Sequence, residues 1–307
     1  MPNLTRITSV WVAALFKALI ARTPAGGRSW LARRMMRGRF DPATLAMADF
    51  CQQALHAWKN RLYVVAQNGE AALLQRLRPF APAVLIDAGA NIGDRTVAAC
   101  EALPGATVHA FEIAESTADL LAATVARYGA RVVVNRCGLG AAEGEVALFL
   151  TPENHTAAST LRGAVAFSLS EQGLATVVES RGRIVTGDGY LRQAGLAHVD
   201  LLKIDVEGAE LAVLQGFQDA FARGDIDLVQ FEYGALNLST RQFLGDYWRF
   251  LTDLGFLVGK LYPEGVAFKS YDLMDEDFTG PNYIACRRDR PDLIAALRCP
   301  VLNVATT

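Results

Sequence analysis

The segment from Val84 to Asp94 constrains the fold more than any other part of the chain. It reads Val-Leu-Ile-Asp-Ala-Gly-Ala-Asn-Ile-Gly-Asp, an apolar run that reaches an acid, Asp87, and continues into two glycines, Gly89 and Gly93. A helical pattern begins directly after it. This order predicts a β-strand, a tight turn and a helix start, and nucleotide-like cofactors bind at such strand tips in open α/β sheets.

The spacing of the glycines narrows the class of cofactor. A dinucleotide-binding turn would read Gly-x-Gly-x-x-Gly and would place a pyrophosphate on the helix N-terminus. Here the pattern is Asp-x-Gly-x-x-x-Gly, from Asp87 to Gly93. A carboxylate in the turn favours a cationic ligand group over a phosphate, and S-adenosylmethionine carries both an ammonium and a sulfonium. An ordinary βα turn is the alternative interpretation of the turn taken alone.

Composition limits the function classes and the compartment. The 307 residues are 51% hydrophobic, which supports a large core, and the formal net charge of -2 gives no nucleic-acid signature. The five cysteines are scattered without a Cys-x-x-Cys pair, which argues against a zinc site or a disulfide framework. We therefore expect a cytoplasmic protein that binds no nucleic acid.

The N-terminal segment is basic, because Lys17 and several arginines precede the first acid, Asp41. Its apolar stretch 10–20 is interrupted by Lys17 and is too short to span a bilayer. A secretory signal fits poorly, whereas the acid-poor, arginine-rich composition leaves an organelle transit peptide open. We expect either the solvated basic face of a packing helix or an amphipathic helix that caps the enzyme or contacts an anionic membrane surface.

Helices are expected up to about residue 80, and short apolar strands alternate with amphipathic helices after it, which is typical of a parallel sheet covered on both faces. The predicted regions are a helical cap over 1–80, a cofactor domain over 81–290 and a tail over 291–307. The predicted strands are 84–87, 107–112, 131–135, 199–205, 227–232, 257–262 and 283–287, and the predicted helices are 94–103, 116–128, 207–221 and 240–254. The interval 140–186 is too long for one crossover, so we expect an inserted hairpin of strands 145–150 and 183–186 that forms a lid or a wall facing the substrate.

Further acids are expected at the carboxyl ends of the later strands. Glu112 ends the second strand, 25 residues after Asp87, where an acid reaches the ribose hydroxyls of an adenosine ligand. Asp205 and Glu207 follow the fourth strand and Glu232 ends the fifth. If those strands are neighbours, Asp205 and Glu232 lie about 5 Å apart, where like charges raise each other's pKa or bind a cation. Helix capping is the structural alternative for Asp205 and Glu207.

Methyl transfer to an oxygen requires a deprotonated nucleophile that is held in line with the methyl group. His155, in the Glu-Asn-His-Thr stretch of the expected lid, and Asp205 are the candidate bases, although a loop histidine is often only solvent-exposed. Glu207 and Glu232 complete the catalytic candidates. Because residues two apart in a strand point to the same side, Lys203, Asp205 and Glu207 are expected to share one polar network.

Taken together, these motifs resemble the FkbM-type S-adenosylmethionine-dependent methyltransferases. The resemblance covers about residues 83–287, and its most specific element is Lys-Ile-Asp-Val-Glu-Gly-Ala-Glu, from Lys203 to Glu210. Two positions depart from the family pattern: Ile113 stands where many relatives have proline, and glycine at 189 stands where a second acid often precedes Tyr-Leu. The other stretches that carry the resemblance are 85–94, 111–112, 185–191, 199–211, 214–217 and 229–233.

The resemblance implies a class I methyltransferase fold, a Rossmann-like, doubly wound sheet of seven core strands with the last one antiparallel. It also implies S-adenosyl-L-methionine as the cofactor, while a divalent metal at Asp205 and Glu232 is the less favoured alternative. Ser159 and Thr160 fall where similar chains carry small hydroxyl residues near the active site. The predicted cofactor contacts are Asp87, Gly89, Asn91, Gly93, Glu112, Ile113, Gly138 and Asp205.

We expect O-methylation of a hydroxyl on a small molecule, sugar or glycolipid. The alternatives are an N-methyltransferase, a nicotinamide-dependent oxidoreductase, which the missing Gly-x-Gly-x-x-Gly argues against, and a cofactor-binding module without catalysis. Acceptor specificity is expected to lie in the insertion 140–186 and in the N-terminal helices. The sequence assigns no oligomeric state.

Overall fold

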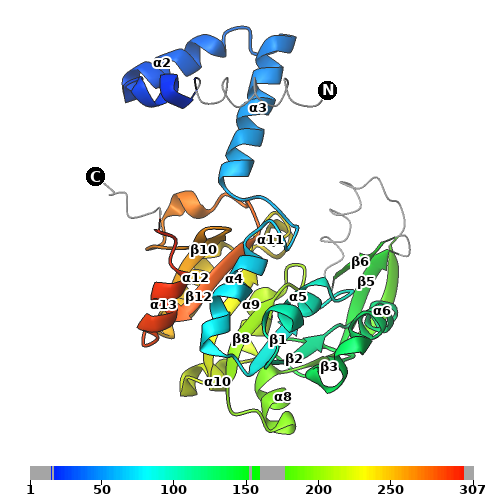
Figure 1. Ribbon diagram of the computed structural model, residues 1–307. Coiled ribbons are helices and arrows are strands. Elements are labelled where there is room, and N and C mark those ends of the chain that lie inside the picture. The colour runs from blue at the N-terminus through cyan, green and yellow to red at the C-terminus, as the bar shows by residue number, and fades with distance from the viewer. Residues whose placement is uncertain (1–14, 16, 152–153, 160–176, 301–307) are drawn as a thin grey trace, which may run out of the picture. The chain divides into compact units, whose positions relative to one another are not determined.

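The computed structural model describes residues 15, 17–151, 154–159 and 177–300, which divide into two compact units, Met1–Trp58 and Lys59–Thr307 (Figure 1). The smaller unit contains helices α2 (Ala25–Met35) and α3 (Pro42–Trp58). Asp41 caps α3, because its Oδ1 accepts a hydrogen bond of 2.8 Å from the Thr44 backbone N–H. Pro42 then occupies the first helical position, where no intrahelical donor is needed.

The larger unit is built on an eight-stranded sheet in the order β11-β10-β12-β9-β8-β1-β2-β3. Seven of these strands are those expected, and β12, the last in sequence, runs antiparallel to both of its neighbours, so the class I methyltransferase fold is confirmed. The eighth strand, β11, pairs antiparallel with β10 at the sheet edge and was not predicted. The strand bounds are β1 Val84–Ala88, β2 Thr107–Phe111, β3 Val132–Asn135, β8 Val199–Ile204, β9 Ile226–Glu232, β10 Phe256–Tyr262, β11 Gly265–Phe268 and β12 Asn282–Arg287.

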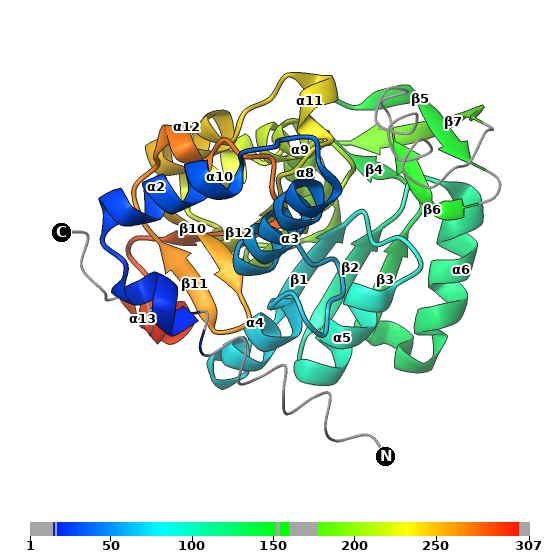
Figure 2. The ribbon, with the colours of Figure 1, turned by 90° about the horizontal axis from the view of Figure 1, so that it is seen from above.

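Helices cover both faces of this sheet, and alternate strand residues enter two different cores. On β8, Leu201 packs in the core formed with α4, α5 and α13, whereas Leu202 packs in the core formed with α8, α9, α10 and α12. Figure 2 shows the two sets of helices on opposite sides of the strands. The helix bounds are α4 Glu70–Leu77, α5 Asp94–Ala102, α6 Glu115–Val125, α8 Gly187–Ala194, α9 Glu210–Gln215, α10 Gln218–Arg223, α11 Asn237–Thr240, α12 Leu244–Asp253 and α13 Pro291–Leu297.

The insertion between β3 and β8 contains a second sheet, in the order β4-β7-β5-β6. Two strands were expected, and the described residues of the insertion form four: β4 Gly138–Leu139, β5 Gly144–Thr151, β6 Asn154–Ser159 and β7 Val178–Val185. β7 begins earlier than expected because it pairs with β5 from Leu150↔Val178 to Gly144↔Ile184. The role of this insertion as a lid stays a prediction.

Several predicted bounds are wrong where distant segments contact the chain. The helix expected over 207–221 is divided into α9 and α10 at Gly216, where a Cβ atom would lie 2.2 Å from the carbonyl oxygen of Gly140. The helix expected over 240–254 is likewise divided into α11 and α12. The helix expected over 116–128 ends at Val125 and continues as a 3₁₀ turn over 126–131.

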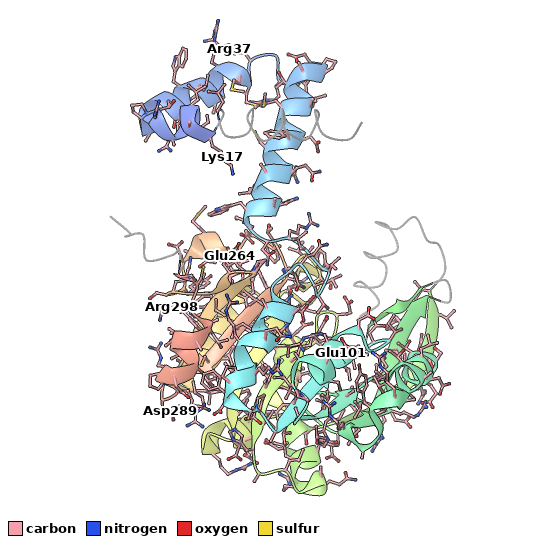
Figure 3. The ribbon with its side chains drawn as sticks, in the orientation of Figure 1. Lys17, Arg37, Glu101, Glu264, Asp289 and Arg298 are labelled. Carbon is pink, nitrogen blue, oxygen red and sulfur yellow. The ribbon has the colours of Figure 1, made fainter. Side chains whose placement is uncertain are left out.

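The expected domain boundaries also differ from the structure. Residues from Lys59 onward belong to the larger unit rather than to a segment 1–80, and α4 buries Leu73, Leu74 and Leu77 in the core. The expected tail 291–307 begins with α13, which buries two leucines against the same core. Charged residues such as Glu101, Glu264 and Asp289 lie on the outside of the larger unit (Figure 3).

Two further observations concern the chain as a whole. All five cysteines are free thiols, and four of them are buried. Among the described residues, no helix combines the length and the apolarity that crossing a bilayer requires.

A buried polar network joins α4 and α5 to the sheet. Glu70 Oε2 forms an ion pair of 3.0 Å with Arg95 Nε and accepts a hydrogen bond of 2.8 Å from Gln230 Nε2, while Asn68 Nδ2 donates to Glu70 Oε1 at 2.7 Å. Burial alone would raise the pKa of Glu70, but the charges of Lys203 and Arg95 outweigh it and lower this pKa below its usual value. Glu70 is therefore ionised, and its buried partners stabilise its negative charge.

Removing Arg95 should cost much more stability than removing an exposed arginine. We expect Arg95→Met to lower the free energy of unfolding by about 3–5 kcal/mol, because Glu70 loses its ion-pair partner while staying buried. The matched control is Arg127→Met, which breaks a pair of 2.9 Å with Glu101 that is more than half exposed and should cost about 1 kcal/mol or less. Urea unfolding followed by circular dichroism measures both, and equal losses would contradict this account.

Candidate functional site

The candidate site lies where β1, β2 and β8 end. The backbone N–H of Gly89 donates to the carbonyl of Phe111 at 3.0 Å, and the N–H of Asp205 donates to the carbonyl of Ala88 at 3.0 Å. Gly89 has φ of +80°, and a Cβ atom there would lie 1.7 Å from the Asp205 carbonyl oxygen. Only glycine therefore lets the turn after β1 pack against the tip of β8, which brings Asp205 beside the turn.

A cavity of about 250 Å³ opens at these strand ends. Of the eight residues predicted to bind the cofactor, six line it: Gly89, Asn91, Glu112, Ile113, Gly138 and Asp205. The other two, Asp87 and Gly93, do not line it. Asp87 is 4% exposed and accepts a hydrogen bond of 2.6 Å from Thr96 Oγ1, while Gly93 begins α5 against the side chain of Leu121.

Glu112 follows β2 and places a carboxyl group in the wall of this cavity. The backbone N–H of Asn91 donates to Oε2 at 3.0 Å and that of Ala114 donates to Oε1 at 2.8 Å, so the carboxyl group is fixed in position. Burial raises the pKa of Glu112, and these backbone hydrogen bonds oppose that rise. A carboxylate has about four lone-pair sites, so the group can still accept a hydrogen bond from a ligand hydroxyl.

The remaining wall of the cavity is mostly apolar and comes in large part from the inserted sheet. A Cβ atom at Gly138 would lie 2.7 Å from Ile184 Cδ1 and 3.1 Å from Ile113 Cδ1, so glycine leaves space between two isoleucines. Sequence reasoning predicted a wall from this insertion but did not identify its residues. Those that were missed are Leu139, Gly140, Ala141, Ala142, Val146 and Ile184.

A single lysine lies between the acids of β1 and β8. Lys203 Nζ donates a hydrogen bond of 2.8 Å to Asp205 Oδ2 and lies 3.9 Å from Asp87 Oδ1. Burial alone would lower the pKa of Lys203, but Asp205, Asp87 and Glu70 outweigh it and raise this pKa. The ammonium group therefore stays charged and compensates Asp205 and Asp87.

Glu207 lies in the wall of the cavity and does not begin a helix. Its φ of 57° and the φ of 102° at Gly208 are left-handed, so α9 starts only at Glu210, which accepts the N–H groups of Val206 and Gly208 at 3.2 and 2.9 Å. Burial, followed by the charge of Asp205, raises the pKa of Glu207 to about 8. Burial also raises the pKa of Glu210 to about 7.

Glu232 faces a second cavity, which shares Gly89, Asn91 and Asp205 with the first. Ile204 pairs with Phe231 in the register of β8 and β9, so Asp205 and Glu232 lie at neighbouring strand tips as expected. Burial, followed by the charge of Asp205, raises the pKa of Glu232 well above its usual value. The second cavity is also lined by Tyr63, Glu70 and Arg95, which belong to no motif in the sequence.

Three residues expected near the active site, His155, Ser159 and Thr160, lie wholly or by their side chains outside the described part of the chain. His155 lies on β6, but its side chain, like that of Ser159, is outside what the structure describes, and Thr160 lies outside the described residues altogether. The role of His155 as a base therefore stays a prediction.

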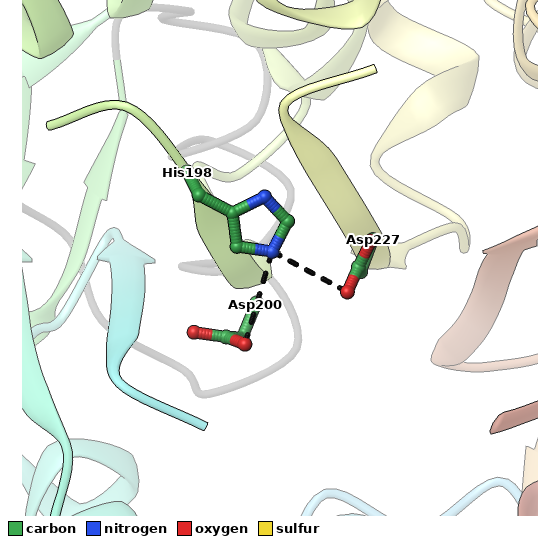
Figure 4. Close-up of side chains that lie close together, drawn as sticks. All are labelled: His198, Asp200 and Asp227. Atoms are coloured by element: carbon green, nitrogen blue, oxygen red, sulfur yellow. Dashed lines mark ion pairs between the residues drawn. The ribbon is translucent and has the colours of Figure 1, made fainter. Parts of the chain in front are cut away.

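Within the described part of the chain, one group of three potential metal ligands has its ligand atoms within 4.8 Å of one another: His198, Asp200 and Asp227. Figure 4 shows His198 Nε2 between the two carboxylates, at 3.8 Å from Asp200 and 3.3 Å from Asp227. These residues lie at the opposite ends of β8 and β9 from Asp205. Asp227 is also paired with Arg290. Asp200 Oδ2 accepts hydrogen bonds of 2.8 and 2.9 Å from the backbone N–H groups of residues 83 and 84. Both carboxylates therefore have a structural role.

The chain matches the family model described as methyltransferase FkbM domain over residues 87–258. It is 34% identical over 157 residues to methyltransferase sdnD of Sordaria araneosa, a match that covers 44% of this chain and 60% of the relative. It is 30% identical over 156 residues to 31-O-demethyl-FK506 methyltransferase FkbM of Streptomyces tacrolimicus, covering 45% and 60%. The hexuronic acid methyltransferase AglP of Haloferax volcanii is 28% identical over 151 residues, covering 49% and 56%. The chain thus spans under two thirds of the length of these relatives.

The raised pKa of Glu210 predicts a loss of stability as the pH rises. Between about pH 4.5 and 7 the folded protein keeps a proton that the unfolded chain releases, so the free energy of unfolding should fall, by roughly 3 kcal/mol for this group. We expect Glu210→Gln to flatten the curve of stability against pH over this interval, measured by urea unfolding at several pH values. The control Glu101→Gln changes an exposed carboxyl and should leave the curve parallel to the wild type. A Glu210→Gln curve with the wild-type slope would contradict the assignment.

Proposed function

Because the chain belongs to the FkbM family of S-adenosylmethionine-dependent methyltransferases, we propose that it methylates a hydroxyl oxygen on a small molecule, sugar or glycolipid. The observation that carries this proposal is the cavity at the strand tips, with the Glu112 carboxyl fixed in its wall and Asp205 at its other side. One relative is named for a demethylated oxygen of FK506 and another for a hexuronic acid, which supports an oxygen acceptor of the polyol type.

The geometry supports one placement of the cofactor. Glu112 would accept hydrogen bonds from the two ribose hydroxyls, and the apolar wall between Ile113 and Ile184 suits a planar adenine ring. The turn at Gly89 and Asn91 would then hold the methionine end next to Asp205. Asp87 does not line this cavity and acts through Lys203, by compensating its charge, rather than by touching the cofactor.

The bound cofactor supplies an electrophilic methyl group on a sulfonium, which leaves as a neutral thioether. The protein's own task is to hold the acceptor oxygen in line with that methyl group and to accept the hydroxyl proton. Asp205 is compensated by Lys203, so its part is orientation. The pKa of Glu207, raised to about 8, suits proton transfer near neutral pH, and burial and the charge of Asp205 raise the pKa of Glu232 as well. N-methylation would use the same cofactor site with an amine acceptor.

Calorimetry with S-adenosylhomocysteine and NAD tests the cofactor class. We expect S-adenosylhomocysteine to bind and NAD to give no heat. Glu112→Ala should weaken the binding of S-adenosylhomocysteine by about 1–3 kcal/mol, the usual cost of a lost hydrogen bond to a charged group. Glu115→Ala, which removes an exposed carboxyl three residues away, should leave the affinity unchanged. Binding of NAD, or an unchanged affinity in Glu112→Ala, would contradict the assignment, and release of S-adenosylhomocysteine during turnover separates an enzyme from a silent binding module.

The smaller unit supports contact with an anionic membrane surface. Helix α2 has no acid and no buried residue, its Trp30 is 66% exposed, and a surface hollow is lined by Trp30, Arg33, Arg34 and Arg37. An exposed aromatic ring among arginines suits the headgroup layer of a bilayer that carries acidic lipids. Such contact would bring the enzyme to an acceptor that is itself a glycolipid.

Sedimentation with vesicles tests this contact. We expect binding to vesicles that contain one third phosphatidylglycerol, loss of binding at high salt, and no binding to pure phosphatidylcholine. Changing Arg33, Arg34 and Arg37 to glutamine should weaken binding roughly 100-fold, at about 1 kcal/mol for each arginine near the surface. The control changes the same number of exposed arginines on the larger unit, at positions 78, 192 and 249, and should bind like the wild type. Equal binding of both variants would exclude α2 as the contact.

A further inference from the structure

The second cavity adjoins the proposed cofactor cavity and has a different character. It has a volume of about 190 Å³, and it shares Gly89, Asn91 and Asp205 with the first cavity. Glu112 lines only the first cavity and Glu232 only the second. If the first cavity holds S-adenosylmethionine, the space on the other side of Asp205 is where an acceptor can approach the methyl group.

The cations in this second cavity are compensated by the protein itself. Lys203 is paired with Asp205 at 2.8 Å, and Arg95 is paired with Glu70 at 3.0 Å and donates a hydrogen bond of 3.2 Å to Gln230 Oε1. The charges of both cations are therefore already compensated, which disfavours the binding of an anionic ligand.

Two acids of the cavity, Glu232 and Asp94, differ from the paired acids Glu70 and Asp205. In the ranges that the structure describes, the Glu232 carboxyl has no hydrogen bond or ion pair with another side chain or backbone group. Asp94, at the first position of α5, is exposed. The cavity therefore presents hydrogen-bond acceptors to a ligand and repels a further negative charge.

We propose that the second cavity binds a neutral, polyhydroxylated acceptor of the sugar type, and that Glu232 removes the proton from the hydroxyl that is methylated. This inference rests on the proposed methyltransferase function. In the step, the acceptor O–H bond breaks, its proton goes to the Glu232 carboxylate, and the oxygen forms a bond to the methyl carbon. The carbon–sulfur bond of S-adenosylmethionine breaks at the same time, so its sulfonium becomes the neutral thioether of S-adenosylhomocysteine, and Glu232 later releases the proton to water.

The pH dependence of the reaction follows from the groups around Glu232. Glu232 must be ionised to accept a proton, so kcat/KM should rise with pH and level off above the pKa of this group. Burial and the negative charge of Asp205 raise that pKa, and Lys203 opposes the rise. The other charged or titratable groups near the cavity are Glu70, Glu207, Asp94, Arg95, and Tyr63 with its partner Arg61.

The acceptor class is tested on the full chain with S-adenosylmethionine and a panel of methyl hexosides in the gluco, galacto, manno and rhamno configurations. The matched uronic acids and amino sugars form the other two arms, and release of S-adenosylhomocysteine is the readout. We expect turnover with at least one neutral hexoside and at least tenfold lower kcat/KM with its uronic acid. Preference for a uronic acid or an amino sugar, or turnover of none of the neutral hexosides, would overturn the inference.

The role of Glu232 is tested with Glu232→Gln and with the control Glu101→Gln, which changes an exposed carboxyl that lines neither cavity. We expect Glu232→Gln to lower kcat at least 100-fold with little change in KM and to abolish the rise of kcat/KM with pH. Glu101→Gln should stay within threefold of the wild type and keep its pH profile. A Glu232→Gln enzyme with the wild-type pH profile would overturn the role.

Binding of S-adenosylhomocysteine separates this inference from the proposed function. Glu232→Gln should bind S-adenosylhomocysteine like the wild type, which also shows that the variant is folded. If the wild type itself does not bind S-adenosylhomocysteine, the proposed function fails. If it binds but the acceptor or pH results are contrary, only the present inference fails.

Discussion

The buried ammonium group of Lys203 is the interaction on which the site depends. Carboxyl groups from β1, β8, β9 and α4 meet at one edge of the sheet, and Lys203 lies among them at 2.8 Å from Asp205 and 3.9 Å from Asp87. Burial disfavours its charge, but the surrounding acids outweigh that effect and keep it protonated. Without this cation, the acids would either repel one another or take up protons.

The charge of Lys203 compensates some of these carboxyl groups more than others. Asp205 is held by Lys203 between two cavities and so has a fixed position and a compensated charge. Glu207 lines the first cavity and Glu232 the second, and burial together with the charge of Asp205 raises their pKa values. The arrangement combines an acid suited to orientation with acids whose pKa values are raised, which is consistent with the proposed methylation of a hydroxyl.

Much of the fold follows from local patterns. The alternation that directs Leu201 and Leu202 into different cores is visible in the sequence of β8, and the strand, turn and helix from Val84 to Asp94 form as expected. The sequence also predicts that Asp205 and Glu232 are neighbours, because they lie at the ends of two parallel strands, β8 and β9. The edge strand β11, the four strands of the insertion and the division of the helix at Gly216 do not follow, since each depends on a partner segment elsewhere in the chain.

The sequence by itself determined the strand tips, the acids on them and the family, because periodicity and motif spacing are properties of neighbouring residues. Only the tertiary structure decided which charges compensate one another. Glu70 and Tyr63 precede β1 and carry no motif, yet both lie in the second cavity with Glu232, more than 150 residues away in the chain. Pairing of buried charges depends on distances of a few ångströms, and the packing of distant segments sets those distances.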